Sequence, residues 1–294
     1  MLQVAILGPG GVGGFLAGAL ERAGTPVTII ARESTAAAVE RGGIRVESVR
    51  LGAFTATPRA VSELDATGMT LVVATKATGL EAALERVHGE PELVVPMLNG
   101  LEHLDLLRAR FGERAVAAAI RIESDHPEPG RYVQTSGFLG IDVAPRSDAV
   151  ERFAETFEAA GIPVRILDSE PQVMWGKLVR LNALACTTSA WNLPLGPIRE
   201  DGLRRSLLRS CIEEGAAVAR ADGADIAPET TMAELDNAHA TLGSSMQRDI
   251  AAGRAPELDA IPGAVLRAAR RHGLECPTIE RLAAKAAARA GAAA

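Results

Sequence analysis

The sequence predicts an α/β protein of two domains, in which a doubly wound parallel sheet is followed by an all-helical segment. Apolar runs of strand length alternate with helix-like segments through the first half of the chain. After Asp168, β-branched runs almost disappear, while helical spacing and helix caps recur. A chain of 294 residues is also long for a single hydrophobic core. We therefore expect one domain over residues 1–168 and a second over residues 169–294.

A glycine-rich turn separates the first expected strand, residues 4–7, from a helix-like segment. The turn reads Gly8-Pro9-Gly10-Gly11-Val12-Gly13-Gly14. In such a turn Gly8 makes the tight bend, Gly10 lets the backbone approach a pyrophosphate, and Gly13 lets the helix pack closely on the strand. The helix N-terminus, with Gly11 and Val12, offers N–H groups to the phosphates. The alternative is an ordinary glycine-rich loop without a ligand. The context favours an N-terminal Rossmann dinucleotide-binding domain.

The residue that follows the second expected strand, residues 27–31, bears on the choice of dinucleotide. NAD sites commonly place an acidic residue there for the ribose 2′-hydroxyl, and this chain has Arg32. A guanidinium suits a 2′-phosphate, so the sequence predicts NADP(H) as the cofactor. The alternative is a solvated surface pair between Arg32 and Glu33.

The remaining elements of the first domain follow from apolar runs and turn residues. Strands are expected at residues 71–75 and 93–98, with an amphipathic helix between them that is marked by Leu80, Ala83, Leu84 and Val87. Further strands, expected to extend the same sheet with antiparallel members, lie at residues 116–122, 132–134 and 138–143. A helix over residues 147–160 and a strand over residues 164–167 complete the domain.

The second domain is expected to contain helices only. One long helix is predicted from Gly202 to Asp222. Thr231 and Glu234 have the spacing of a capping box that would open another helix. Pro262 suits the first turn of a helix that runs to residue 272.

Composition narrows the class of protein. The chain is 47% hydrophobic and 23% charged, which is ordinary for a soluble globular protein, and its net charge of −6 argues against nucleic acid as a partner. Cys186, Cys211 and Cys276 form no C-x-x-C pair, and the histidines lack metal-ligand spacing, so no metal is expected. The N-terminus lacks signal-peptide features, and no apolar stretch is long enough for a bilayer. A cytoplasmic protein without membrane contact is predicted.

Polar residues at expected strand ends are candidates for a site. Lys76 follows one strand and Asn99 the next, at the sheet edge where ligands of such folds bind. Asn99-Gly100 alone could equally be a turn.

Two charged residues of the second domain could carry chemistry. On a helix, Lys177 would share a face with Leu181, Leu184 and Thr188, and there it could polarise a carbonyl or deliver a proton. The alternative is a surface lysine whose stem covers apolar neighbours. Glu257 lies in a connector, a common place for functional residues, although a solvated loop acid is the simpler interpretation.

Taken together, the motifs resemble those of the ketopantoate reductase (2-dehydropantoate 2-reductase) family along essentially the whole chain. Besides the glycine turn, Arg32 and Asn99-Gly100, the resemblance is carried by Trp175-x-Lys177-Leu178, Thr188-x-Ala190 with Trp191-Asn192, Ser244-Ser245-Met246-x-x-Asp249 and Glu257-Leu258-Asp259.

The resemblance implies a role for each of these residues. Lys177 would donate the proton to the ketone, assisted by Glu257, and Asn99 would lie between nicotinamide and substrate. Ser245 would hold the substrate carboxylate, with Thr188 also at the substrate site. Gly8, Gly10, Gly11, Val12, Gly13 and Asn99 would contact the cofactor, and Arg32 would bind its 2′-phosphate. Lys76 is also expected at the cofactor, from its place at the end of a strand.

The chain departs from the family pattern at the substrate site. Four residues after Lys177, where the family usually has an Asn, this chain has Leu181. Eight residues after Lys177, where the family usually has a second Asn, it has Ala185. Asn182 does not replace the first, because one residue turns a helical side chain by about 100°. Pro262 also stands where the family often has Asn. Losing two amides removes hydrogen bonds that select a hydroxylated substrate.

The sequence therefore predicts an NADPH-dependent reductase of a small 2-oxo acid, nominally converting 2-dehydropantoate to (R)-pantoate. Two alternatives stay open. One is a paralogous reductase of a less polar 2-oxo acid or ketone, and the other is a non-enzymatic NADP(H) sensor. The Ala- and Leu-rich helices leave room for a homodimer.

Overall fold

The computed structural model describes residues 2–293, which form two compact units. One unit comprises the chain up to Leu98 together with His103–Val173, and the other comprises Asn99–Glu102 together with the chain from Met174. We call them the sheet unit and the helical unit. The segment Asn99–Glu102 therefore belongs to the helical unit, although it lies within the first half of the sequence. The predicted boundary between residues 168 and 169 stays a prediction.

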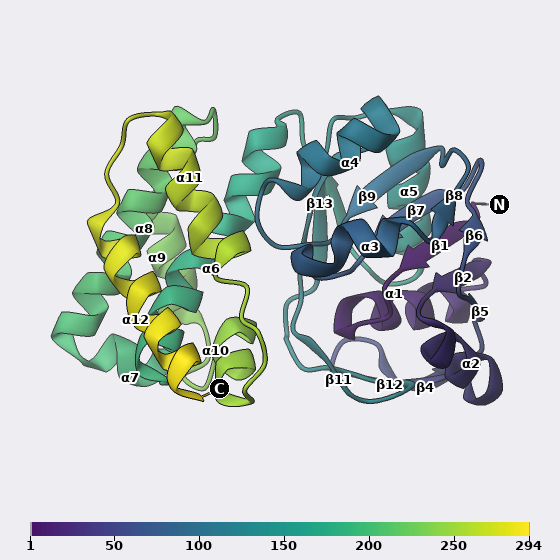
Figure 1. Cartoon of the computed structure of the whole chain (residues 1–294), viewed down its shortest axis with the longest axis horizontal. Helices are drawn as coiled ribbons and strands as arrows, with labels where there is room; N and C mark the ends of the chain where they lie inside the picture. Colours follow the sequence, from purple (N-terminus) through teal and green to yellow (C-terminus); the bar gives the residue numbers. More distant parts are fainter. Residues whose placement is uncertain (1, 294) are drawn as a thin grey trace. The chain divides into compact units, whose positions relative to one another are not determined.

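A five-stranded parallel sheet lies at the centre of the sheet unit (Figure 1), and its strand order is β5-β2-β1-β7-β9. The strands are β1 (Val4–Leu7), β2 (Val27–Ile30), β5 (Arg59–Val61), β7 (Thr70–Val73) and β9 (Leu93–Pro96). Because β2 and β7 pair with opposite sides of β1, the strand order reverses at β1. This is the doubly wound topology of a Rossmann fold, which confirms the predicted fold class.

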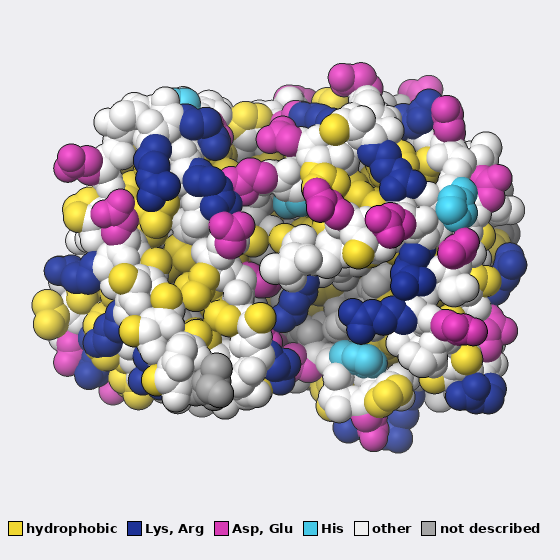
Figure 2. Space-filling model, in the orientation of Figure 1, with side chains coloured by type: hydrophobic (Ala, Val, Ile, Leu, Met, Phe, Trp, Pro, Cys, Tyr) yellow, Lys and Arg dark blue, Asp and Glu magenta, His cyan; other side chains and the backbone are white. Residues whose placement is uncertain are grey.

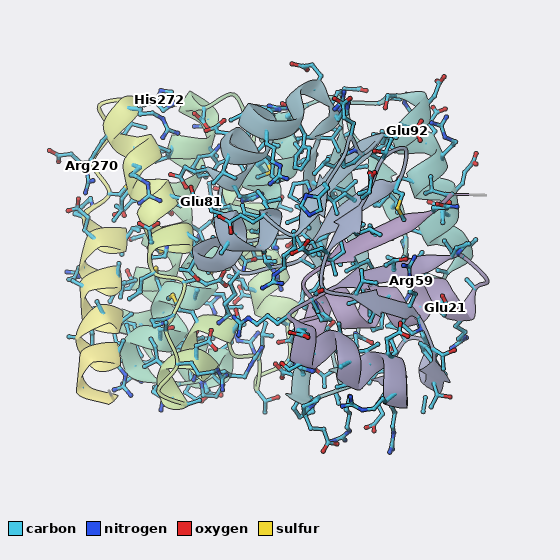
Figure 3. All side chains as sticks on the ribbon, turned by 45° about the vertical axis from the view of Figure 1, so that its right-hand side comes forward. Glu21, Arg59, Glu81, Glu92, Arg270 and His272 are labelled. Atoms are coloured by element: carbon cyan, nitrogen blue, oxygen red, sulfur yellow. The ribbon has the colours of Figure 1, made fainter. Side chains whose placement is uncertain are left out.

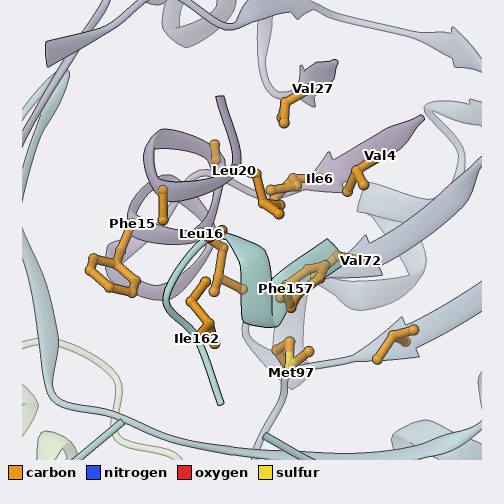
Figure 4. Packing of buried hydrophobic residues seen from close by; sticks show 14 of the residues in the cluster. Val4, Ile6, Phe15, Leu16, Leu20, Val27, Val72, Met97, Phe157 and Ile162 are labelled. Atoms are coloured by element: carbon orange, nitrogen blue, oxygen red, sulfur yellow. The ribbon is translucent and has the colours of Figure 1, made fainter. Parts of the chain in front are cut away.

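Helices cover both faces of this sheet, which explains why its strands are continuously apolar. Alternate residues of β1 enter different cores, since Val4 and Ile6 pack on one face and Ala5 and Leu7 on the other. The first core includes α1 (Gly11–Arg22) and α5 (Asp148–Ala159), as Figure 4 shows for part of the cluster. The second core includes α3 (Leu80–Leu84) and α4 (His103–Phe111). The remaining helices of the unit are α2 (Glu33–Gly42), η1 (Ala77–Gly79) and η2 (Gly112–Arg114).

The other strands form sheets of their own, and among the described residues the predicted extension of the first sheet is present only as one bridge. There the N–H of Val116, just before β10, donates to the carbonyl of Val94 on β9. One sheet has the order β10-β13-β14 (Ala117–Arg121, Gly140–Ala144, Val164–Ile166). Another has the order β11-β12-β3-β4 (Ser124–Glu128, Arg131–Gln134, Ile44–Ser48, Gly52–Ala56). The segment after β10 turns into the β11–β12 hairpin, and β12 then pairs with the distant strand β3 instead of continuing the first sheet.

The helix predicted to include Val87 is shorter than expected. Helix α3 ends at Leu84, and Val87 belongs to the short strand β8 (Val87–His88), which pairs with β6 (Leu64–Asp65). Val87 is fully buried in the core that also holds Leu80 and Leu84. The helical spacing of apolar residues therefore extends beyond the residue where the helix ends.

The helical unit is built around a core of its own. Its helices are α6 (Glu170–Trp191), α7 (Leu195–Glu200), α8 (Gly202–Ala221), α9 (Pro228–Asn237), α10 (Ser245–Ala251), α11 (Ala264–Arg271) and α12 (Pro277–Ala293). Helix α8 confirms the long helix predicted there. Within residues 2–293, no helix combines the length and the apolar character that crossing a membrane requires.

Two predicted helix starts need correction. Thr231 does not cap a helix, because α9 already begins at Pro228 and the Thr231 hydroxyl donates to the carbonyl of Ala227. Pro262 lies inside a π-helical turn, η3 (Asp259–Gly263), that leads directly into α11. Proline lacks an N–H and crowds the carbonyl four residues earlier. The wider turn relieves this, since the N–H of Gly263 reaches back five residues to the carbonyl of Leu258.

Candidate active site

The glycine turn lies at the point where the strand order of the sheet reverses. Gly8 follows β1 directly and has a φ of +92°, which favours glycine. A Cβ at Gly8 would lie 2.8 Å from Cγ2 of Thr75, at the end of the adjacent strand β7. In open α/β sheets, ligands bind at this crevice outside the carboxyl ends of the strands.

The positions of the turn differ in why each is occupied by glycine. A Cβ at Gly13 would lie 2.1 Å from the carbonyl oxygen of Gly8, and a Cβ at Gly11 would lie 2.1 Å from that of Ser124. Both positions therefore need glycine for packing within the protein. Gly10 is different, because its φ is −71° and the nearest atom to its Cβ would be the Ala74 oxygen at 4.0 Å.

Nothing among the described residues requires glycine at position 10. A Cβ there would instead fill space beside the N-terminus of α1, whose N–H groups have no side-chain cap. That space and those donors fit the pyrophosphate of a dinucleotide. The side-chain hydroxyl of Thr75, next to this turn, is buried and has no hydrogen-bond partner among residues 2–293.

The β11–β12 hairpin covers the glycine turn, a feature that the sequence analysis missed. The Ser124 hydroxyl donates to the Gly11 carbonyl at 2.7 Å, and the Tyr132 hydroxyl donates to the Pro9 carbonyl at 3.2 Å. His126 stacks on the Tyr132 ring with centroids 4.9 Å apart. Burial raises the pKa of Tyr132 to about 12 and lowers the pKa of His126, so both rings are neutral at pH 7. No local pattern in the sequence marks this pairing.

The basic residues predicted for the cofactor lie on the surface of the sheet unit. Arg32 is the N-cap residue of α2, and its exposed side chain forms no ion pair with Glu33 or with any other described residue. The alternative of an Arg32–Glu33 pair is therefore wrong for this structure. Lys76 precedes η1 and is exposed. Figure 2 shows basic and acidic side chains interspersed over the face in view.

In the helical unit, Asn99 and Glu257 are hydrogen-bonded. The side-chain amide of Asn99 donates to Oε2 of Glu257 at 2.9 Å. Glu257 is only 9% exposed, so the alternative of a solvated loop acid is wrong. Its connector is fixed from the other end, because Arg254 forms an ion pair of 2.9 Å with the buried carboxylate of Asp249. A buried carboxylate beside an amide donor can orient an ammonium group or a substrate hydroxyl.

Lys177 is half-buried on α6, and a firm anchor lies two residues before it. The indole N–H of Trp175 donates to Oδ2 of Asp222 at 2.8 Å, and Oδ1 of Asp222 meets Nε2 of His272 at 2.9 Å. Burial alone would raise the pKa of Asp222, but the hydrogen bonds from His272 and Trp175 outweigh it and lower that pKa. Figure 3 labels His272 at the end of α11. This anchor fixes the part of α6 that carries Lys177.

Ser244 links Thr188 to the helix that begins with Ser245. The Thr188 hydroxyl donates to the Leu184 carbonyl at 2.7 Å, so it accepts from the Ser244 hydroxyl 2.8 Å away. Ser244 in turn accepts from the N–H of Gln247 and caps α10, of which Ser245 is the first residue. Thr188 is completely buried, whereas Ser245 is half-buried. Any effect of Thr188 on a substrate would therefore pass through Ser244 and α10.

The structure shows the surroundings of the residues on α6 where the chain departs from the family pattern. Asn182 is completely buried and points its amide at two thiols, with Nδ2 3.6 Å from Sγ of Cys211 and Oδ1 3.4 Å from Sγ of Cys186. Its side chain therefore belongs to the core of the helical unit and cannot replace an amide at position 181. Leu181 packs against that core while half-exposed, and Ala185 is buried within it.

Two family models match the chain, one for each half. "Ketopantoate reductase PanE/ApbA" matches residues 4–145, and "Ketopantoate reductase PanE/ApbA C terminal" matches residues 171–290. The chain belongs to the ketopantoate reductase family. Membership confirms the resemblance found in the sequence, and it confirms an oxidoreductase of the 2-dehydropantoate 2-reductase type.

Individual relatives agree with the ketopantoate reductase family. The chain is 31% identical to a 2-dehydropantoate 2-reductase of Caulobacter vibrioides over 288 residues, covering 94% of this chain and 95% of the relative. A 2-dehydropantoate 2-reductase of Mycobacterium tuberculosis is also 31% identical, over 281 residues and 93% of each chain. A PanE/ApbA family ketopantoate reductase from Ralstonia eutropha superimposes with a TM-score of 0.88 at 26% identity, covering 99% of both chains.

The same fold also occurs in a D-mandelate dehydrogenase, whose ternary structure contains NADH and anilino(oxo)acetate. That enzyme superimposes with a TM-score of 0.88 over 99% of both chains, but at 18% identity. At this identity, the similarity shows a shared fold.

Proposed function

We propose that this ketopantoate reductase family member reduces a small 2-oxo acid with NADPH, with 2-dehydropantoate to (R)-pantoate as the nominal reaction. The hydrogen bond between Asn99 and the buried Glu257 carries the proposal. It gives the helical unit, which also holds Lys177, an oriented carboxylate of the kind that general acid catalysis needs.

The cofactor assignment rests on the sheet unit. Gly10 leaves space beside uncapped N–H groups of α1, and we assign the pyrophosphate to this turn, with contacts from Gly8, Gly11, Val12 and Gly13. The unpaired guanidinium of Arg32 is assigned to the 2′-phosphate, and Lys76 to the cofactor as well. When bound, NADPH supplies the hydride that reduces the carbonyl carbon.

Lys177 is assigned the proton transfer. In this proposal its ammonium group hydrogen-bonds the carbonyl oxygen, stabilises the negative charge that develops there and donates a proton. Asn99 engages Oε2 of Glu257, and the other carboxylate oxygen is assigned to Lys177, which favours the protonated lysine. Ser245 is assigned to the substrate carboxylate, with Thr188 supporting it through Ser244.

NADPH oxidation tests this function. Purified protein with NADPH should consume the cofactor on addition of 2-dehydropantoate, and the product should be the R enantiomer by chiral chromatography. Tight NADPH binding without turnover of any 2-oxo acid would overturn the proposal.

A second candidate within the same class is a reductase of a less polar 2-oxo acid. It is favoured by one observation: Leu181 presents an apolar side chain four residues after Lys177, while the Asn182 amide is engaged with core thiols. A panel of 2-oxo acids with apolar side chains, compared by kcat/KM, separates the two. Higher kcat/KM for 2-dehydropantoate than for every apolar analogue would exclude this candidate.

We also propose a homodimer in the cytoplasm. A dimeric ketopantoate reductase from Staphylococcus aureus shares the fold at a TM-score of 0.82 and 20% identity. Light scattering after size exclusion measures the mass directly, and a monomeric mass would contradict the dimer.

A further inference from the structure

The segment Asn99–Glu102, which we call the strap, is fixed to the helical unit at both ends. At its start, Asn99 donates to Glu257, as described above. At its end, Oε1 of Glu102 accepts a hydrogen bond of 2.7 Å from Nε of Arg267 on α11. The chain enters the strap from the sheet unit after Leu98 and returns to that unit at His103.

The middle of the strap lies directly on the π-helical turn η3. Gly100 has a φ of +91°, and a Cβ at this position would lie 2.4 Å from the carbonyl oxygen of Ala260. Any other residue would both strain the backbone and push the strap away from η3. The backbone of the strap is thus in close contact with the turn that follows Glu257.

A single guanidinium joins the strap to this turn. Besides Glu102, Arg267 binds Asp259 three times. Its Nη1 donates to Oδ1 at 2.6 Å, and its Nη2 donates to the backbone carbonyl at 2.9 Å and to Oδ2 at 3.5 Å. Gly263 leaves room for it, since a Cβ there would lie 3.1 Å from Nη1. The hydrogen bonds that Arg267 donates to Glu102 and Asp259 raise its pKa, so its charge is permanent at any working pH.

Asp259 follows Glu257 by two residues, and Glu102 follows Asn99 by three. Arg267 therefore holds the two segments that carry the partners of the Asn99–Glu257 hydrogen bond. We propose that Arg267 is a positioning residue that keeps the Asn99 amide on the Glu257 carboxylate. The effect on turnover rests on the proposed function, whereas the effect on the hydrogen bond does not.

The side chain of Glu102 is 40% exposed and that of Asp259 is 85% exposed, and ion pairs at such exposed sites contribute little to global stability. The planar fork can reach Glu102 and Asp259 together, which the single ammonium of a lysine does not reproduce. Removing the guanidinium should therefore loosen the strap while leaving the folded helical unit intact.

The experiment compares Arg267→Gln and Arg267→Lys with Arg205→Gln. Arg205 is a matched control because it also binds a carboxylate with two nitrogens, to Asp236 at 2.8 and 2.7 Å, away from the strap. The first readout is the side-chain amide signal of Asn99 in NMR spectra of the full-length protein, assigned by its loss in Asn99→Ala.

We expect hydrogen exchange of this amide to rise at least fivefold in both Arg267 variants and to stay within twofold of the wild type in Arg205→Gln. Glu102→Gln, which keeps Arg267 but weakens its hold on the strap, should give an intermediate rise. With an active substrate, kcat should fall more than KM rises in the Arg267 variants, and Arg267→Lys should not restore it.

Unchanged Asn99 exchange in Arg267→Gln and Glu102→Gln would overturn the proposal, whether or not the protein reduces 2-oxo acids. Equal loss of kcat in Arg205→Gln would also overturn it, because the effect would then be general destabilisation. If the wild type turns over no 2-oxo acid, the proposed function fails, and the exchange measurement still decides the role of Arg267.

Discussion

The side-chain amide of Asn99 donates a 2.9 Å hydrogen bond to the carboxylate of Glu257, a residue 158 positions further along the chain. Asn99 follows β9 of the parallel sheet in sequence, yet it belongs to the helical unit. The pair therefore joins the strap to the connector before η3, and both residues lie within the helical unit. Lys177, to which we assign the proton transfer, lies in the same unit as this pair.

Replacing Asn99 with Ala should lower kcat by about 10-fold to 100-fold, because the buried Glu257 loses its hydrogen-bond donor and its fixed orientation. Steady-state kinetics measure the effect. Asn237→Ala, at the end of α9, is the control for loss of an amide and should keep the wild-type kcat. A normal kcat in Asn99→Ala would show that the hydrogen bond is only structural.

Gly10→Ala should weaken NADPH binding without destabilising the protein, since the nearest non-neighbouring atom to its Cβ among residues 2–293 would be the Ala74 oxygen at 4.0 Å. Gly13→Ala should instead cost about 1–3 kcal/mol of unfolding free energy, because its Cβ would lie 2.1 Å from the Gly8 oxygen. Titration with NADPH and chemical denaturation separate the two effects. Gly42→Ala on α2, also with open space around its Cβ, is the control for both. Unchanged NADPH affinity in Gly10→Ala would remove the pyrophosphate from this turn.

Arg32→Ala should raise the dissociation constant for NADPH by about 10-fold to 100-fold and leave that for NADH nearly unchanged. The reason is that only NADPH carries the 2′-phosphate that we assign to this guanidinium. Fluorescence titration with each dinucleotide measures the ratio, and Arg59→Ala on β5 is a control on the same unit. A parallel loss of both affinities would assign Arg32 to another part of the cofactor.

Tyr132 should ionise only near pH 12, because burial raises its pKa from the ordinary value of 10.0. A raised pKa favours the protonated folded state, so this contribution to stability is complete below pH 10 and is lost as pH rises from 10 through 12. Tyr132 is the only tyrosine of the sequence, so tyrosinate absorbance reports on it directly. Ionisation at pH 10 in the folded protein would mean that the β11–β12 hairpin does not cover the ring.

The fold was predictable where the information is local. The run at residues 4–7, the glycine turn and the helix expected over residues 147–160 each depend on neighbouring residues, and the structure has all three. Pairing between distant segments was not predictable in this way. Nothing near Tyr132 in the sequence indicates that β12 pairs with β3 rather than with the first sheet.

The same limit applies to the candidate site. Lys177, Asn99 and Glu257 stand in motifs that the resemblance identified, whereas Arg267 occurs in an ordinary helical run. Its partner Glu102 is 165 positions away, and only the folded chain brings the two together. Sequence spacing also gave no sign that Asn182 contacts the thiol of Cys211, because Cys211 lies on a different helix.

The most direct test of the account is a single-turnover measurement of NADPH oxidation in Lys177→Ala, alongside Lys285→Ala. Lys285 lies over the ring of Trp191 and is a control for loss of a lysine in the same unit. If Lys177 donates the proton, the rate should fall by about 10²-fold to 10⁴-fold in Lys177→Ala, with NADPH affinity retained, and should stay at the wild-type value in Lys285→Ala. A wild-type rate in Lys177→Ala, or loss of NADPH binding as the sole defect, would contradict it.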